Sequence, residues 1–106
     1  MAKSAKREAR NARVNLMSAA FKRLGSVSAI LTEKAEELEA IAPDVDLLKE
    51  YLASRQWMED FEADERGEIS NGVDRSVLSE DGLYNLLSEL DDLMKTFERL
   101  QERLAQ

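Results

Sequence analysis

The feature that most constrains the fold is a regular spacing of apolar residues in two long stretches of the chain. In the first stretch, apolar or small residues recur in alternating steps of three and four, at Val14, Met17, Phe21, Leu24, Ser28, Leu31, Ala35, Leu38 and Ala42. The second stretch repeats the alternation at Leu83, Leu86, Leu90, Leu93, Phe97, Leu100 and Leu104. This spacing places the side chains on one face of an α-helix. The sequence therefore predicts two long helices with heptad patterns.

Helix-breaking and capping residues divide the part of the chain between these stretches. Pro43 disfavours helical geometry at Ala42, so we expect the first helix to end there and a short helix to follow from Asp44 to Ala53. Ser54 is a candidate N-cap, and Gly67 a candidate C′ residue, of a second short helix that contains the only tryptophan. Two short middle helices are thus predicted.

These elements predict an all-α protein, a small antiparallel helical bundle in which the two long helices pack together and the middle helices add a third layer. We expect one domain over residues 14–106. Gly25, with Ser26 and Ser28, predicts a bend or a close helix crossing within the first helix. A homodimer in which the apolar faces pair between chains is the alternative.

A connector with two glycines precedes the last helix. Four apolar residues are expected to hold it against the bundle: Ile69, Val73, Val77 and Leu78. We expect Ser79 to cap the last helix, with Glu80 and Asp81 in its first turn, where acids complement the helix dipole.

Charge is distributed unevenly along the chain. Residues 1–25 carry seven basic side chains against one acid, although the whole chain has a formal net charge of −7. Residues 1–13 form a basic N-terminal arm that we expect to fray in solution or to be ordered only by a partner, because it has no apolar face to bury. Its candidate polyanion-binding residues are Lys3, Lys6, Arg7, Arg10 and Arg13.

The residue types that are missing exclude several functions. The chain contains no cysteine and no histidine, which rules out disulfides, thiol nucleophiles, Cys/His zinc sites and imidazole acid–base chemistry. No nucleophile–base pair or phosphate-binding glycine loop is present, so we expect neither catalysis nor a cofactor. No stretch resembles a signal peptide or a membrane span, so the expected location is the cytoplasm.

Two sequence blocks resemble a known family. Residues 57–65 are WMEDFEADE, and residues 77–87 are VLSEDGLYNLL. Together they resemble an uncharacterised bacterial family, the domain of unknown function numbered 4298, with W-x-x-D-[YF]-E-A-D-E and V-L-S-E-D-x-[VIL]-Y-x-L-L blocks in this order. The resemblance covers about residues 47–105 and implies a small helical protein from a bacterium or phage. It implies no activity, and Asp74, Arg75 and Ser76 replace the Lys-Arg-Gly that members tend to carry before the second block.

The two blocks also suggest physical roles. Trp57, Phe61 and Tyr84 are candidates for a structural aromatic cluster whose polar atoms find partners among Asp60, Asp64, Ser79 or Asp81. The less favoured alternative is a hard-cation site built from five carboxylates. Its members would be Glu59, Asp60, Asp64, Glu80 and Asp81.

These observations predict a non-enzymatic interaction protein that binds a protein partner through an acidic, aromatic-anchored surface. The candidate partner-binding residues are Glu59, Asp60, Glu62 and Glu65. Two alternatives remain: a nucleic-acid-binding accessory protein that uses the basic arm, or an acidic phage-type inhibitor that imitates nucleic acid.

Overall fold

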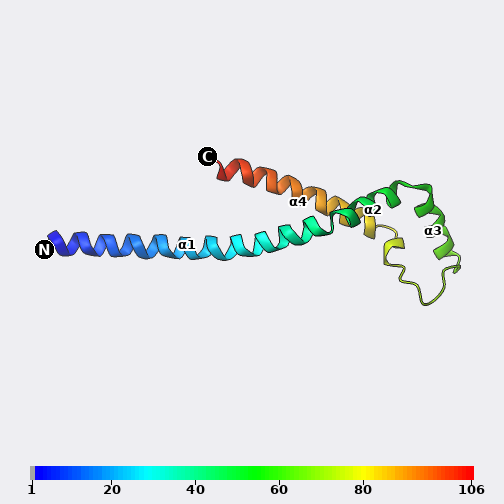
Figure 1. Cartoon of the computed structure of the whole chain (residues 1–106), viewed down its shortest axis with the longest axis horizontal. Coiled ribbons are helices and arrows are strands. Elements are labelled where there is room, and N and C mark those ends of the chain that lie inside the picture. The colour runs from blue at the N-terminus through cyan, green and yellow to red at the C-terminus, as the bar shows by residue number, and fades with distance from the viewer. Residues whose placement is uncertain (1) are drawn as a thin grey trace. The chain divides into compact units, whose positions relative to one another are not determined.

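Helices account for all the regular secondary structure in residues 2–106, the part of the chain that the computed structural model describes (Figure 1). The elements are α1 (Ala2–Ala40), α2 (Ala42–Ala53), α3 (Arg55–Glu65), the 3₁₀ turn η1 (Ser76–Leu78) and α4 (Gly82–Leu104). The prediction of an all-α protein with two long and two short helices is confirmed. The chain divides into two units, one ending at Ala42 and the other covering Pro43–Gln106.

The first helix begins earlier than the sequence predicted. We expected residues 1–13 to fray, but α1 is one uninterrupted helix from Ala2 to Ala40 (Figure 1), so that expectation is wrong for residues 2–13. The reason is local. This segment consists mainly of Ala, Lys, Arg and Glu, which have high helix propensity, and no glycine or proline occurs before Gly25.

Gly25 does not interrupt α1. A Cβ atom added at this position would meet no atom within 4 Å, so the surface beside Gly25 is open. The helix instead ends near Pro43, as predicted. The Ile41 amide makes the last backbone hydrogen bond to Glu37, and α2 then begins with proline in its first turn, where a missing N–H costs nothing.

Both ends of α3 are fixed by the residues that the sequence indicated. The Ser54 hydroxyl accepts a hydrogen bond from the Trp57 amide, which makes Ser54 the N-cap. At the other end, the Gly67 amide donates to the Asp64 carbonyl and the Glu68 amide donates to the Ala63 carbonyl. This pair of bonds is a Schellman motif, which needs the positive φ of 73° that Gly67 adopts.

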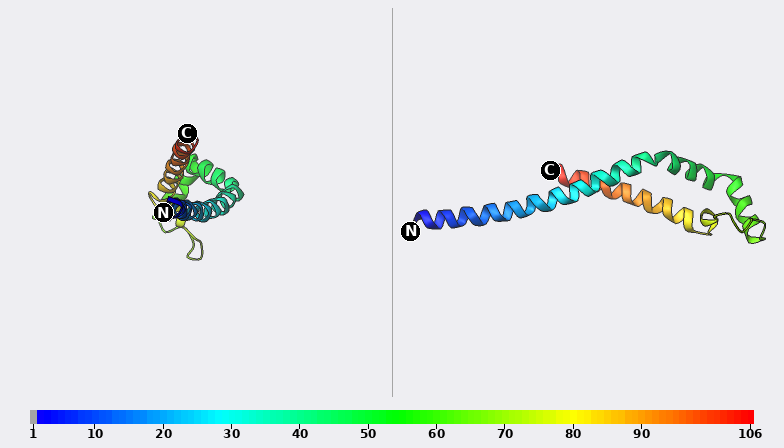
Figure 2. Two further views of the ribbon diagram at one scale, coloured as in Figure 1. Left: turned by 90° about the vertical axis from the view of Figure 1, so that its left-hand side faces the viewer. Right: turned by 60° about the horizontal axis from the view of Figure 1, so that its bottom comes forward.

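The connector after α3 turns back and leads through η1 into α4 (Figure 2). Leu78 in η1 and Leu83 in α4 are the buried hydrophobic residues, with 6% and 5% of their surface exposed. Ile69 and Val77 are half-buried, but Val73 is 54% exposed, so its predicted anchoring role is wrong. η1 packs against both α3 and α4 and so links them.

Ser79 does not cap α4, contrary to the prediction. The helix begins at Gly82, and Asp81 occupies the N-cap position without a side-chain cap hydrogen bond. The 3₁₀ turn over Ser76–Leu78 uses the residues just before Ser79, and the N-cap of α4 lies two residues later than predicted, at Asp81. Gly82 suits this geometry because a Cβ atom there would lie 2.1 Å from the Ser79 hydroxyl oxygen.

The apolar faces of the two long helices are largely exposed within their own units. On α1 the exposed fractions reach 78% at Phe21, while on α4 the buried Leu83 is followed by exposed residues such as Leu93 and Leu100. The antiparallel packing of α1 against α4, the homodimer and the single domain over residues 14–106 stay predictions. No helix in residues 2–106 combines the length and the apolar composition that crossing a membrane requires.

Two glycine substitutions with opposite expected effects test this description. Gly25→Ala should raise the free energy of unfolding by about 0.5 to 1 kcal/mol, because alanine is the better helix former and meets no neighbour. Gly67→Ala should lower it by about 1 to 2 kcal/mol, because its φ is positive although the space is equally open. Thermal unfolding followed by circular dichroism measures both. Destabilisation by Gly25→Ala would instead reveal a close helix crossing at that position.

Candidate functional site

Two aromatic residues of α3 form the inner side of the candidate site. The Trp57 and Phe61 rings are stacked, with centroids 5.3 Å apart and planes inclined by 17°. The Trp57 indole N–H donates a hydrogen bond of 3.0 Å to the Val77 carbonyl oxygen. The prediction of a side-chain partner for the indole was wrong, because η1 brings a backbone carbonyl to it.

Tyr84 is separate from this stacked pair. It lies in the first turn of α4 and is 64% exposed, whereas Trp57 and Phe61 are half-buried. The structure thus brings together two of the three residues proposed for an aromatic cluster. Since Trp57 belongs to the first sequence block and Val77 to the second, their hydrogen bond joins the two blocks directly.

The Asp60 carboxylate joins α3 to α2 through hydrogen bonds within the chain. Its carboxylate accepts hydrogen bonds from the Tyr51 hydroxyl at 2.6 Å and from the Gln56 amide at 2.8 Å. These two bonds, the first above all, hold the pKa of Asp60 below its ordinary value. Burial, followed by the hydrogen bond to Asp60, raises the pKa of Tyr51 to about 12. The sequence analysis grouped Asp60 with the partner-binding residues, but its carboxylate is already hydrogen-bonded within the chain.

Tyr51 is a residue of this site that the sequence analysis did not identify. The sequence does contain a signal for this pair. Tyr51 lies near the end of one short helix and Asp60 about one turn into the next, and only Ser54 separates the two helices. Pairing them required the angle between α2 and α3, which the sequence does not specify.

A second carboxylate of α3 is also engaged. Asp64 accepts a hydrogen bond from the Arg75 guanidinium at 2.6 Å, so this ion pair ties the end of α3 to the segment just before η1. Arg75 is half-exposed, and ion pairs of that kind contribute little, about 0 to 1 kcal/mol. The structure thus gives Arg75 a local partner within the chain.

The remaining carboxylates of α3 point away from these contacts and define an acidic ridge, consisting of Glu59, Glu62 and Glu65. All three are exposed, and none makes a hydrogen bond or ion pair with another side chain among residues 2–106. Their spacing of three residues places them within about 120° of arc and about 9 Å of helix length. At about 100° per residue, Trp57 and Asp64 lie on the other side of α3, and Phe61 lies between them and Glu65. The ridge is therefore presented to solvent by a helix held on its opposite side.

The structure also locates the other candidate residues. The five basic residues of the N-terminal arm are exposed on the first three turns of α1. Glu80 and Asp81 are exposed just before α4, and Asp60 and Asp64 are bound to Tyr51, Gln56 and Arg75. Residues 2–106 contain no group of three or more acidic side chains placed to hold a metal ion, so the structure does not assemble the alternative five-carboxylate site.

The chain belongs to the family described as a domain of unknown function, DUF4298, whose model matches residues 14–100. The match includes most of α1, a region where the sequence analysis recognised only the heptad pattern. Residues 2–13, which carry the basic arm, lie before it. Neither the curated proteins nor the solved structures contain a match to the chain.

Replacing Trp57 by phenylalanine tests the link between the two sequence blocks. The variant keeps an aromatic ring beside Phe61 but loses the donor to the Val77 carbonyl, so the free energy of unfolding should fall by about 1 to 3 kcal/mol. Urea unfolding followed by circular dichroism measures the change. Met58→Leu, an exposed and volume-conserving change on the same helix, is the control and should stay within about 0.5 kcal/mol of the wild type. Equal values for both variants would contradict the role of the indole.

Tyr51→Phe tests the hydrogen bond to Asp60 through its pH dependence. The pKa of Asp60 is lowered on folding, so the bond stabilises the fold above about pH 4 and this contribution is lost as the pH falls through the folded-state pKa. The pKa of Tyr51 is raised, so its contribution is complete below pH 10.0, its ordinary value, and is lost as the pH rises toward about 12. The difference in melting temperature between wild type and variant should therefore be largest between these limits.

Carbon-detected NMR titration supplies the second measurement for this variant. In Tyr51→Phe the pKa of Asp60 should move up toward its ordinary value of 3.8, although the Gln56 bond opposes a complete return. Tyr84→Phe, at an exposed tyrosine, is the matched control and should leave the Asp60 titration unchanged. An unchanged Asp60 pKa in Tyr51→Phe would show that the bond does not form in solution.

Proposed function

We propose that this member of the DUF4298 family is a non-enzymatic interaction protein that binds a basic surface of a protein partner through the acidic ridge of α3. One observation carries the proposal. α3 is held on its inner side by the Trp57–Val77 hydrogen bond and the Asp64–Arg75 ion pair, while Glu59, Glu62 and Glu65 remain exposed on its outer side. Such an arrangement presents three glutamate side chains from a helix whose position is fixed.

The fixed geometry matters because binding costs conformational entropy. Each side chain or segment that must be ordered on association reduces the affinity, by about 0.5 to 1.5 kcal/mol for a flexible side chain. Here the helix is already formed, with an N-cap at Ser54 and a Schellman motif at Gly67. Only the three glutamate side chains have to be ordered when a partner binds.

The negative charge of the unit that carries the ridge favours a basic partner. The unit Pro43–Gln106 carries 17 acidic and 7 basic residues, so the ridge lies within a negative surface that attracts cationic surfaces over a distance of about one Debye length, roughly 8 Å in physiological salt. This field speeds association and opposes anionic partners. The absence of cysteine and histidine supports the non-enzymatic part of the proposal.

The test is affinity purification with mass spectrometry, using the wild type and two triple variants of equal charge change. The ridge variant is Glu59→Lys, Glu62→Lys and Glu65→Lys. The control variant is Glu33→Lys, Glu36→Lys and Glu102→Lys, three exposed glutamates on α1 and α4. The expected result is at least one protein that both wild type and control retain and the ridge variant loses.

A direct binding assay with that protein then gives the magnitude. The ridge variant should bind at least about tenfold more weakly, equivalent to about 1.4 kcal/mol, and the loss should shrink at high salt. If ridge and control variants retain the same partners, the ridge does not bind them. If the partner is a nucleic-acid-binding protein that duplex DNA displaces, the ridge acts as an imitation of nucleic acid, which is the alternative function.

A further inference from the structure

The first three turns of α1 carry five cations on a single face. At about 100° per residue, Lys3, Lys6, Arg7, Arg10 and Arg13 fall within about 120° of arc around the α1 axis. All five are exposed, and none makes an ion pair among the residues that the structure describes. Glu8, the one acid of this segment, lies on the opposite side of the helix. We call the five residues the basic face.

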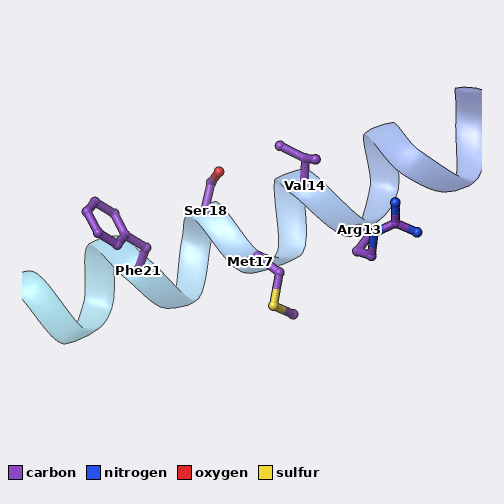
Figure 3. Close-up of a pocket in the computed structure, with 5 residues that line it drawn as sticks. All are labelled: Arg13, Val14, Met17, Ser18 and Phe21. Atoms are coloured by element: carbon purple, nitrogen blue, oxygen red, sulfur yellow. The ribbon is translucent and has the colours of Figure 1, made fainter.

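The basic face continues the apolar stripe of α1. Stepping back from Val14 by four, three and four residues reaches Arg10, Arg7 and Lys3, so these cations occupy the positions that carry apolar residues in the rest of the helix. Figure 3 shows the junction, where Arg13 adjoins Val14, Met17, Ser18 and Phe21 around a shallow hollow on α1. The face changes from cationic to apolar within about one turn.

This change limits what can cover the basic face. A helix that packs on the apolar stripe cannot extend onto residues 3–10 with further apolar side chains, because it would bury unpaired cations, which costs far more than apolar burial returns. The basic face is thus a binding surface distinct from the apolar stripe, and it requires an anionic partner.

The residues around the basic face distinguish among polyanions. Residues 2–13 contain no aromatic and no large apolar side chain, and the far side of this segment carries Ala5, Ala9 and Ala12. A helix that lies in a membrane surface needs an apolar face to insert, and single-stranded nucleic acid is held by stacking on aromatic rings. Neither feature is present in this segment, which favours the regular array of phosphates in duplex DNA over those two polyanions.

We propose that the basic face of α1 binds the phosphate backbone of duplex DNA without reading its sequence. The five cations are spread over about 15 Å of the helix. Duplex DNA carries one phosphate charge per about 1.7 Å of its axis when both strands are counted, so its phosphates are dense enough to pair with each cation. The site does not involve the acidic ridge of α3.

Fluorescence anisotropy with a 20-base-pair duplex of arbitrary sequence tests the proposal on the full chain. The wild type should bind at low salt, with a slope of log K against log salt of about −4 if four to five phosphates are contacted. Lys6→Gln with Arg10→Gln should reduce that slope by about 2 and weaken binding at least about tenfold at low salt. Glutamine keeps the helix propensity of the segment, and circular dichroism verifies that α1 remains folded.

The matched control is Lys22→Gln with Arg23→Gln. It removes the same charge from the same helix, but both residues lie more than about 100° away from the centre of the basic face. Its binding should stay within about threefold of the wild type, and its slope should not change. Equal losses in the two variants would overturn the proposal, because net charge alone would then explain the binding.

Two further results would overturn the proposal. One is no anisotropy change with the duplex at 25 mM salt, and the other is binding to vesicles of an anionic phospholipid under conditions where the duplex does not bind. The ridge variant of α3 separates this proposal from the proposed function. The ridge variant should bind the duplex as tightly as the wild type or more tightly, because it removes negative charge from α3. The two proposals can therefore fail independently, each by its own measurement.

Discussion

The hydrogen bond from the Trp57 indole to the Val77 carbonyl holds together the only part of the described chain with a buried core. A connector joins α3 to α4, and η1 within it packs against both helices. The indole hydrogen bond holds the η1 backbone, and Leu78 of η1 and Leu83 of α4 are buried. Tyr51 and Asp60 extend the same arrangement to α2. The orientation of the acidic ridge follows from these contacts, since a helix attached through its aromatic side must present its other side to solvent.

The amount of apolar surface that remains exposed distinguishes this chain from a small globular domain. Among residues 2–106, two hydrophobic side chains are buried, whereas most large hydrophobic residues along α1 and α4 remain 36% to 78% exposed. Exposed apolar stripes of that length are characteristic of surfaces that another helix covers. The chemistry of the molecule is therefore distributed over three separate surfaces: an acidic ridge, an apolar stripe and a basic face.

The comparison between sequence and structure shows which signals are local. Ser54, Gly67 and Pro43 act within one or two turns through caps, a positive φ and a missing amide, and their effects were predicted correctly from their positions. Predictions that depended on more distant contacts were less successful. The indole was assigned a side-chain partner and Ser79 the cap of the last helix, and both predictions failed because η1 was not foreseen. Val73 was assigned an anchoring role but is exposed at a turn, where its amide donates to the Ser70 carbonyl. A three-residue 3₁₀ turn has no hydrophobic period that could have predicted it.

By itself, the sequence determined the all-α class, the long apolar stripes, the breaks between helices and the separation of basic and acidic charge, because propensity, periodicity and capping depend on residues close together in the chain. Only the tertiary structure decided which carboxylates are available. Asp60 and Asp64 belong to the same acidic block as Glu59, Glu62 and Glu65, yet Tyr51 and Arg75 bind the first two and leave the other three exposed. That division depends on where a neighbouring helix and a loop place a hydroxyl and a guanidinium, and no local spacing encodes it.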